Sequence, residues 1–499
     1  MRWSELSVAF GPPPAGDIEV GGVIYDSRLA GPGQVFVAIP GVHRDGHDFV
    51  KAALAGGSPA AVVEHPVAGA PLAQMVTVED CRIALAQLAA AVFEHPARAV
   101  PVIGITGTDG KTSTTTMLQS ALSPSLGPVG SLTTVDFRIG EEIEPNLSRQ
   151  TTLEAPEIQS LLRRMVNRDC RAVAVEATSH GLALHRLDGI EFAGAVFTNI
   201  THEHLDFHKT WEAYFEAKAS LLDRTRVAGG FAVLNRDDPR AFERLRKRAP
   251  ARLLTYSAAG GADADLRAGP SRLDGTGLTF PVQTPAGEAE VSLGMAGRWN
   301  VANALAALGA GLLLDQPLGS LVHGLGRLRA IPGRMETVDL GQPFSVIVDY
   351  AHTPAALTLI LYELRSATPA RLWVVFGSAG ERDLAKRAEM GRIAARLADQ
   401  VVVTSEDPRG EDPEAIIEQI CRGAEEAGAQ EGDNLHRLPD RGAAIRLAIH
   451  SALPGDTVLL AGKGHERSIL GPGGAHPWDE RGEAERSIRS RSALAGGED

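Results

Sequence analysis

Short apolar runs that end in polar turns recur along the whole chain, and helical stretches separate many of them. Apolar runs of this length, bounded by turn residues, predict buried strands of a largely parallel sheet. In the N-terminal part they are Gly22–Tyr25, Val35–Ile39 and Ala60–Val63. We therefore predict an α/β fold that begins with a small α/β domain over residues 1–98.

A second block of the same pattern follows. Its predicted strands are Ala99–Ile105, Arg171–Val175 and Ala195–Phe197, and the stretch Trp211–Leu222 is predicted to be a helix. Lys218 lies among small and apolar neighbours in that helix, where an exposed surface lysine is the ordinary expectation. Ile331-Pro332-Gly333-Arg334 breaks the pattern, so we place a central domain over residues 99–331.

Beyond this break, strands again alternate with helical stretches. The strands are Val346–Val348, Val374–Phe376, Val401–Val403 and Val458–Leu460, and each ends in a polar loop. This alternation predicts a doubly wound, Rossmann-like sheet in a C-terminal domain over residues 332–499. No G-x-G-x-x-G opens the sheet, so a dinucleotide is not expected. The glycine-rich stretch Gly471–Ala475 is expected to be irregular.

One glycine turn stands out between a predicted strand and a predicted helix, in the sequence GITGTDGKTSTTT from Gly104 to Thr116. It is a variant of the P-loop G-x-x-x-x-G-K-[ST], because Ile105 stands five residues before Gly110. Its backbone N–H groups and the helix N-terminus suit a polyphosphate. Lys111 suits the outer phosphates and the Thr112 hydroxyl suits Mg²⁺. The candidate ATP site is the turn itself: Gly107, Thr108, Asp109, Gly110, Lys111 and Thr112.

Charge and composition exclude several classes of protein. The formal net charge of the 499-residue chain is −13, and proteins that bind phosphate backbones usually have a basic excess, so we expect no nucleic-acid partner. Cys81, Cys170 and Cys421 form no C-x-x-C pair, which argues against a disulfide framework and favours core positions. The N-terminus lacks a basic segment before an apolar stretch, and no run approaches the roughly 20 apolar residues of a membrane span. We expect a soluble, cytoplasmic protein with no membrane partner.

Polar residues cluster at the ends of the central strands, where parallel sheets bind ligands. Glu176 ends one strand, and a His-rich stretch from Thr201 to His208 follows another. The H-x-H-x-x-x-H spacing is not a standard zinc set, and hard oxygen ligands are expected beside a P-loop, so Glu176 is the first candidate for Mg²⁺. Whether one of these His residues is a metal ligand stays open. Ser179-His180 lacks the G-x-S-x-G elbow of a serine nucleophile.

Nearly the whole chain carries a series of ordered motifs: TGTDGKT, EATSHG, FTNITHEHLDFH, GRWNVANALAA, PGRMETV, DYAHTP, SEDPRGEDP and GKGHE. Together they resemble the Mur ligases, and among these the enzymes that add the third residue of the peptidoglycan stem peptide. The resemblance implies a UDP-binding first domain, a central ATP-binding domain and a C-terminal domain for the incoming amino acid. It also implies that ATP phosphorylates the D-glutamyl carboxylate of UDP-N-acetylmuramoyl-L-alanyl-D-glutamate, and that a diamino acid then attacks the acyl phosphate.

The resemblance also implies roles for individual residues. The catalytic residues would be Lys111, Glu176, His204 and Lys218. The Mg²⁺ ligands would be Thr112, Glu176, His204 and a carbamylated Lys218. The ATP contacts outside the glycine turn would be Asn300, Arg334, Asp349 and His352. The muramoyl substrate would contact Ser27, His43, Thr151, Thr152, Thr178 and Arg186. The amino acid would contact Arg382, Glu406, Asp407, Arg409, Gly462 and Glu466. We expect a monomer whose partners are small molecules.

The sequence departs from the family pattern at several of these positions. Gln150 stands where Asn is usual, and Leu184 stands where some members have Gln. Members selective for meso-diaminopimelate have D-N-P-R where this chain has Glu406-Asp407-Pro408-Arg409. Arg409 favours diaminopimelate, because a bidentate Arg left unpaired is unfavourable. Asp407 adds a negative charge that favours lysine or ornithine, which stay open as alternatives.

Two rival functions are weighed against this one. Folylpolyglutamate synthetase, a related ligase, would lack the first domain. A nucleotide-binding scaffold that has lost catalysis would be expected to lack one of Lys111, Glu176, His204 or Lys218, and all four are present.

Overall fold

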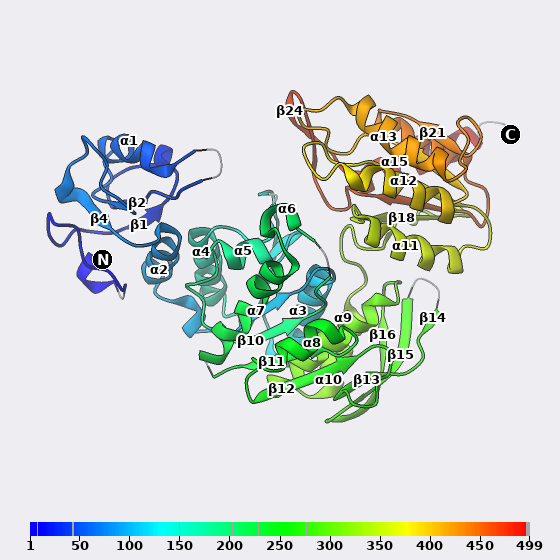
Figure 1. Cartoon of the computed structure of the whole chain (residues 1–499). Helices are drawn as coiled ribbons and strands as arrows, with labels where there is room; N and C mark the ends of the chain where they lie inside the picture. Colours follow the sequence, from blue (N-terminus) through cyan, green and yellow to red (C-terminus); the bar gives the residue numbers. More distant parts are fainter. Residues whose placement is uncertain are drawn as a thin grey trace. The chain divides into compact units, whose positions relative to one another are not determined.

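A computed structural model of the chain describes residues 1–6, 8–41, 44–148, 150–201, 203–227, 229–274 and 277–495. The chain divides into two compact units. Residues 1–269, 281–290 and 302–325 form the first unit, and residues 270–280, 291–301 and 326 onward form the second. Figure 1 traces the elements from the N-terminus in blue to the C-terminus in red.

The first unit begins with a four-stranded parallel sheet in the order β1-β2-β3-β4. Its elements are β1 (Gly22–Ile24), η2 (Ser27–Leu29), β2 (Gln34–Val37), α1 (Val50–Ala55), β3 (Ala61–Val63), β4 (Met75–Thr77) and α2 (Cys81–Val92). Val35, Val37 and Val62 pack against Leu85 and Leu88 of α2 in one buried cluster. The three strands predicted for this region are confirmed.

A 12-stranded sheet follows, in the order β14-β15-β13-β12-β11-β10-β5-β9-β6-β7-β8, with β16 paired to β15. Its strands are β5 (Val102–Thr106), β6 (Val129–Leu132), β7 (Asp136–Ile139), β8 (Glu142–Pro145), β9 (Ala172–Glu176), β10 (Phe192–Phe197), β11 (Phe231–Asn235), β12 (Arg252–Ser257), β13 (Leu266–Ala268), β14 (Arg272–Asp274), β15 (Gly277–Thr284) and β16 (Gly287–Leu293). β5 is buried throughout and lies between β9 and β10, parallel to both. The exits of three strands therefore meet at one edge of the sheet.

The helices between these strands are α3 (Lys111–Leu126), α4 (Ala155–Asn167), α5 (Ser179–Ala183), α6 (Leu205–His208), α7 (Trp211–Val227) and α8 (Pro239–Leu245), and α9 (Trp299–Leu313) and α10 (Leu318–Arg327) follow the last strand. The predicted helix at Trp211 is confirmed as α7. Its Tyr214, Phe215 and Leu221 lie in the core with Phe192 of β10. Since Lys218 lies one turn from both Tyr214 and Leu221, it falls on the same buried face.

The second unit contains a six-stranded sheet in the order β17-β18-β22-β19-β20-β21. Its strands are β17 (Glu336–Thr337), β18 (Ser345–Asp349), β19 (Leu372–Phe376), β20 (Gln400–Val403), β21 (Leu435–Arg437) and β22 (Thr457–Ala461). All neighbouring pairs are parallel except β17 with β18.

Two sets of helices cover this sheet, and each has its own buried cluster. One cluster includes Leu361 of α11 (Pro354–Ala367), Met390 of α12 (Ala385–Leu397) and Ile420 of α13 (Pro413–Glu426). The other includes Ile445 of α14 (Arg441–Ser451) and Ile488 of α15 (Glu480–Ala495). The doubly wound sheet is thus confirmed. The expectation that Gly471–Ala475 is irregular is wrong, because this stretch joins the antiparallel hairpin of β23 (Ser468–Gly471) and β24 (Gly474–Pro477).

Candidate functional site

The glycine turn after β5 has the backbone that its sequence requires. Gly107 and Gly110 have φ angles of 154° and 81°, in the range that favours glycine. A Cβ at Gly107 would lie 1.8 Å from Thr198 Oγ1, and one at Gly110 would lie 2.3 Å from Asn303 Oδ1. Both glycines are therefore needed for conformation and for space.

Lys111, the first residue of α3, folds back over this turn. Its Nζ donates to Gly107 O at 3.1 Å and to Thr108 O at 2.7 Å. Thr112 follows and is 4% exposed. The turn therefore holds a cation on its inner side with a buried hydroxyl next to it, which is the arrangement that polyphosphate binding uses.

The end of β10 supports the turn from the other side. Thr108 N donates to Asn199 O at 2.7 Å, and Asp109 N donates to Asn199 Oδ1 at 2.9 Å. Thr198 Oγ1 donates to Asp109 O at 2.6 Å. Thr198 and Asn199 directly follow β10, and their structural role is to hold the glycine turn through these hydrogen bonds.

Lys218 is buried, so the expectation of an exposed lysine is wrong. It is 1% exposed, its Nζ donates to Gly107 O at 2.5 Å, and it lies 4.5 Å from the Tyr214 ring centroid. Burial and the charge of Lys111 hold the pKa of Lys218 well below its usual range. Two lysines from distant parts of the sequence therefore meet at one carbonyl of the turn.

Glu176 ends β9, where it lies in register with Ile105 of β5. It is 1% exposed. Its Oε1 accepts from Thr134 N at 2.9 Å, and its Oε2 lies 3.3 Å from Thr134 Oγ1. Thr134 Oγ1 also lies 2.8 Å from Thr151 Oγ1. Sequence reasoning missed Thr134, which orients the carboxylate, because a Thr after a strand carries no distinctive signal.

The predicted substrate residues Thr151, Thr152, Thr178 and Arg186 come together around Glu176. Thr152 Oγ1 donates to Glu176 O at 2.9 Å and accepts from Thr178 Oγ1 at 2.9 Å. Arg186 donates to Thr152 O at 2.9 Å and forms an ion pair with Glu154 at 2.6 Å. Ser27 begins η2, directly after β1, and His43 lies outside the described residues.

His204 belongs to a group of rings beside α7. Its ring centroid lies 4.7 Å from that of His180, and His180 lies 5.6 Å from His208. The His208 ring lies 5.4 Å from Tyr214. Ser179 Oγ is buried and has no hydrogen-bond partner among the residues that the structure describes, so these residues show no nucleophilic dyad of Ser179 and His180.

Among the described residues, one trio of acids and histidines lies close enough to share a metal ion, and it is Asp45, His47 and His65. His47 Nδ1 pairs with Asp45 Oδ1 at 2.7 Å, and His47 Nε2 accepts from Glu64 N at 2.9 Å. Both ring nitrogens are thus in use, and this trio is better explained as a structural hydrogen-bond network.

In the second unit, three of the predicted ATP residues lie around Tyr350. Asp349 ends β18 and accepts from Met335 N and Ala351 N, each at 2.8 Å. Burial raises the pKa of Asp349 and the charge of Arg334 opposes the rise. The Arg334 guanidinium lies 4.8 Å from the Tyr350 ring centroid, and His352 Nδ1 donates to Tyr350 O at 2.8 Å.

Two asparagines of α9 have different surroundings. Asn300 Nδ2 donates to Ala296 O at 2.7 Å. Asn303 Oδ1 accepts from Thr114 Oγ1 at 3.3 Å and lies against Gly110. The i, i+3 spacing of Asn300 and Asn303 is the sequence signal that could have identified Asn303 as a support of the glycine turn.

The predicted amino-acid residues lie on the loops that leave β19, β20 and β22. Glu406 is 7% exposed, and its Oε2 has no hydrogen-bond partner in the part of the chain that the structure describes. A Cβ at Gly462, whose φ is 104°, would lie 3.3 Å from that oxygen. Arg382 is exposed on the loop after β19. Gly380 N of the same loop donates to Asp407 O at 2.8 Å, so the β19 and β20 loops are joined.

Asp407 is not a free negative charge, which corrects the expectation from the sequence. Its Oδ1 accepts from Lys463 Nζ at 2.8 Å and from Leu470 N at 2.9 Å. Lys463 is 0% exposed and also pairs with Glu466. The local sequence around Asp407 does not reveal this pairing, because Asp407 and Lys463 are 56 positions apart.

Arg409 faces a cavity of about 390 Å³, which Glu381, Leu470 and Gly471 also line. Its φ is 55°, and its N donates to Leu470 O at 2.8 Å. Its Nε is buried and has no hydrogen-bond partner among the described residues. A guanidinium with an unused buried donor beside a cavity suits a carboxylate ligand.

Family models match three parts of the chain. "Mur ligase family, catalytic domain" covers residues 19–93, "Mur ligase middle domain" covers residues 105–311, and "Mur ligase, glutamate ligase domain" covers residues 333–464. The UDP-N-acetylmuramyl-tripeptide synthetase of Roseiflexus sp. (strain RS-1) is 46% identical over 484 residues, 94% of each chain. The chain belongs to the Mur ligase family.

Two further proteins, a curated relative and a solved structure, are also similar to this Mur ligase. The UDP-N-acetylmuramoyl-L-alanyl-D-glutamate–2,6-diaminopimelate ligase of Streptomyces coelicolor is 42% identical and covers 94% of the chain and 92% of its own length. A solved structure of a ligase with that same name has a TM-score of 0.65, is 32% identical and covers 95% of each chain. The protein is thus an enzyme of the ligase class with the family's α/β architecture.

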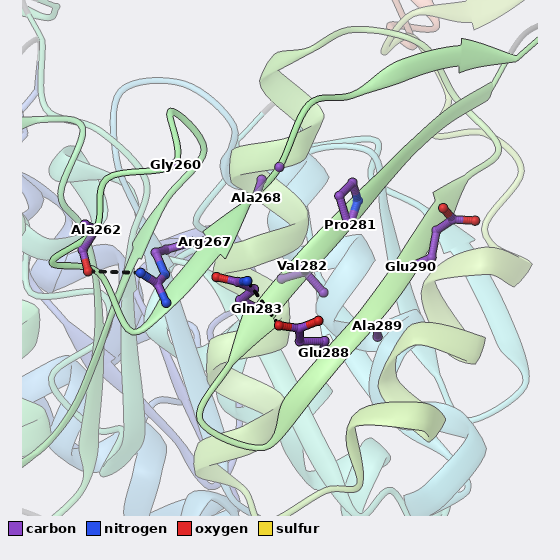
Figure 2. A pocket seen from close by; sticks show the side chains of 11 residues that line it. Gly260, Ala262, Arg267, Ala268, Pro281, Val282, Gln283, Glu288, Ala289 and Glu290 are labelled. Carbon is purple, nitrogen blue, oxygen red and sulfur yellow. Dashed lines mark hydrogen bonds between the residues drawn. The ribbon is translucent and has the colours of Figure 1, made fainter.

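A further cavity of this Mur ligase lies elsewhere in the first unit. It measures about 510 Å³ and is lined by Arg267, Gln283, Glu288, Glu290 and their small neighbours on β13, β15 and β16. The Gln283 amide donates to Glu288 at 3.1 Å and Arg267 donates to Ala262 O at 3.2 Å. Figure 2 draws both hydrogen bonds as dashed lines. None of the predicted site residues lines it, so we do not assign the active site there.

Two further features lie outside the candidate site. Cys81, Cys170 and Cys421 are free and buried, as predicted for core residues. Among the helices that the structure describes, none combines the length and apolarity needed to cross a bilayer.

Proposed function

We propose that this Mur ligase uses ATP to join a diamino acid to the D-glutamyl carboxylate of UDP-N-acetylmuramoyl-L-alanyl-D-glutamate, as a step of peptidoglycan synthesis. The names of its relatives support this reaction. The observation that carries the proposal is the register at the centre of the sheet. Glu176 lies beside Ile105, directly before the turn that holds Lys111, so phosphate and carboxylate ligands have adjacent supports.

The first step joins two anions and therefore needs cations. A D-glutamyl carboxylate oxygen attacks the γ-phosphorus, the bond to the ADP oxygen breaks, and an acyl phosphate forms. Lys111 Nζ would exchange its two carbonyl acceptors for phosphate oxygens, and the N–H groups of the turn would hold the remaining oxygens. The diamino acid's amine then attacks the acyl carbon, phosphate leaves, and the nitrogen loses its proton.

We further propose that ATP binds with Mg²⁺. Thr112 and Glu176 offer hydroxyl and carboxylate oxygens, the donor type that Mg²⁺ prefers, and His204 is a candidate for a second ion. When bound, Mg²⁺ would neutralise charge on the transferring phosphoryl group. Thr134 holds the Glu176 carboxylate in a fixed orientation, which suits a ligand residue.

We propose that Lys218 is carbamylated. A buried ammonium beside Lys111 is unfavourable, whereas its neutral amine can form a bond with CO₂, lose a proton and become an anionic ligand. With isotope-labelled bicarbonate, NMR of the wild-type protein should show a carbamate carbon signal that Lys218→Ala lacks. If the wild-type protein shows no such signal, the carbamate proposal is wrong.

We propose meso-2,6-diaminopimelate as the preferred diamino acid. The buried, unpartnered Nε of Arg409 supports a ligand with a distal carboxylate, and the ion pair of Asp407 with Lys463 removes the main argument for lysine or ornithine.

We also propose that the enzyme acts in the cytoplasm as a monomer. Light scattering after gel filtration would test the monomer.

One experiment tests the reaction and the amino acid together. The protein is incubated with ATP, Mg²⁺, the UDP-muramoyl dipeptide and each of diaminopimelate, lysine and ornithine, and the product is weighed. We expect one new amide and the fastest turnover with diaminopimelate. Lys111→Ala should lower the rate about 100-fold or more. Equal turnover of the three amino acids would refute the proposal that Arg409 selects diaminopimelate through its distal carboxylate. A rate of Lys111→Ala equal to that of the wild type would refute the assignment of the phosphate site.

A further inference from the structure

The loops after β20 and β22 meet across the end of β19. In the sheet order, β19 lies between β22 and β20, and its exit begins with Gly377. A Cβ there would lie 2.4 Å from Thr404 O and 3.0 Å from Glu406 Cβ. The absence of a side chain at Gly377 therefore lets the β20 loop cross the exit of β19 and reach the β22 loop.

Lys463 stands where these loops meet. It follows Gly462, its side chain is 0% exposed, and its ammonium contacts two carboxylates, Asp407 at 2.8 Å and Glu466. A buried ammonium is stable only when it is paired. With both carboxylates ionised, the three groups carry one net negative charge, so Lys463 cancels one of the two negative charges beside the predicted amino-acid site.

Lys463 is also linked to Arg409 through a chain of hydrogen bonds. Asp407 Oδ1, which accepts from Lys463, accepts from Leu470 N as well at 2.9 Å. Leu470 O in turn accepts from Arg409 N at 2.8 Å. Arg409 has a φ of 55°, which is unfavourable for a residue with a Cβ, so these neighbouring contacts are what hold its backbone in place.

We propose that Lys463 is a positioning and specificity-determining residue of the amino-acid site. It neutralises Asp407, orients Glu466 and fixes the Leu470 backbone that holds Arg409. In this way the site can accept a distal carboxylate despite the presence of Asp407. The inference rests on the proposed function, because it concerns which diamino acid that reaction takes.

The test compares kcat/KM for diaminopimelate and for L-lysine at saturating ATP and UDP-muramoyl dipeptide. Lys463→Met removes the ammonium beside Asp407 and makes the site more negative, which should repel a distal carboxylate and attract an ammonium. We expect the ratio of the two kcat/KM values, diaminopimelate over lysine, to fall roughly 10- to 100-fold. Lys463→Arg keeps the charge and should retain most of the wild-type ratio.

Two variants of Asp407 separate charge from structural damage. In the Lys463→Met background, Asp407→Asn removes the negative charge that Lys463 no longer neutralises and should recover about tenfold or more of the lost ratio. Asp407→Asn alone leaves Lys463 paired with Glu466, so this variant is expected to fold, and it should raise the ratio above that of the wild type. A fall in the ratio for this single variant would overturn the proposal even if Lys463→Met does not fold.

Arg371→Met provides a matched control at the other end of the same sheet. Arg371 pairs with the buried Asp456 at 2.8 Å, just before β19 and β22 begin, so its loss also breaks an ion pair of this sheet. We expect a lower unfolding temperature but an unchanged ratio. If Lys463→Met likewise leaves the ratio unchanged, the role of Lys463 is only structural. If the wild-type protein ligates no diamino acid, it is the proposed function that fails.

Discussion

The glycine turn allows one substitution to be worked out from its geometry. Gly110 has a φ of 81°, and an added Cβ would lie 2.3 Å from Asn303 Oδ1. Gly110→Ala would therefore carry about 1–2 kcal/mol of left-handed backbone strain. Displacing Asn303, which accepts from Thr114, would add about 1–3 kcal/mol. The second contribution falls on the loop that is proposed to hold the phosphates.

The expected result is weaker nucleotide binding. If the displaced loop loses about 1.4 kcal/mol of binding energy, the Kd for ATP rises about tenfold. Titration with a fluorescent ATP analogue would measure this Kd, and thermal unfolding would measure the loss of stability in parallel.

Gly127→Ala is the matched control for this substitution. Gly127 follows the same helix α3 at its other end, has a φ of 87°, and has nothing within 4 Å of an added Cβ. Gly127→Ala should therefore introduce backbone strain without a steric clash, so we expect a lower unfolding temperature and an unchanged Kd for the ATP analogue. Asn303→Ala combined with Gly110→Ala should restore part of the affinity by removing the clash. Equal Kd values for the two single alanine variants would refute the close-approach argument.

Three further predictions concern other parts of the chain. Thr134→Val keeps the backbone hydrogen bond from Thr134 N to Glu176 and removes the side-chain hydroxyl. The Mg²⁺ concentration that gives half-maximal rate should therefore rise about fivefold. A titration of the reaction rate with Mg²⁺ would measure this concentration. The hydrogen bonds from Arg387 and Glu381 N lower the pKa of Glu411 from 4.5 to about 2. A carboxyl group whose pKa is lower in the folded state stabilises that state fully above its unfolded pKa and loses this effect as the pH falls through its folded pKa. The free energy of unfolding of the wild type should therefore exceed that of Glu411→Gln by a constant amount above about pH 4.5, and the difference should fall toward pH 2. Unfolding curves measured at a series of acidic pH values would show this. Arg186→Met breaks the pair with Glu154 and should raise KM for the UDP-muramoyl dipeptide about tenfold in steady-state kinetics, with KM for ATP unchanged.

Local sequence determined the elements and the turn chemistry of this protein. The strand before Gly107, the helix after it and the acid at the end of β9 each follow from a few neighbouring residues, because strand and turn formation depend on local apolar pattern and on glycine. The doubly wound C-terminal sheet was predictable for the same reason. The bounds placed at residues 98 and 331 remain predictions, although each matched family region falls within one of the three predicted domains.

Only the tertiary structure decided which distant groups meet. Lys218 and Gly107 are 111 residues apart, and Asp407 could be seen as paired only once the β20 and β22 loops were found to cross the exit of β19. Strand order and the burial of a lysine arise from packing between elements, and no local pattern encodes them. The sequence therefore predicted the chemical groups of the site, whereas the fold determined their partners and so their effective charge.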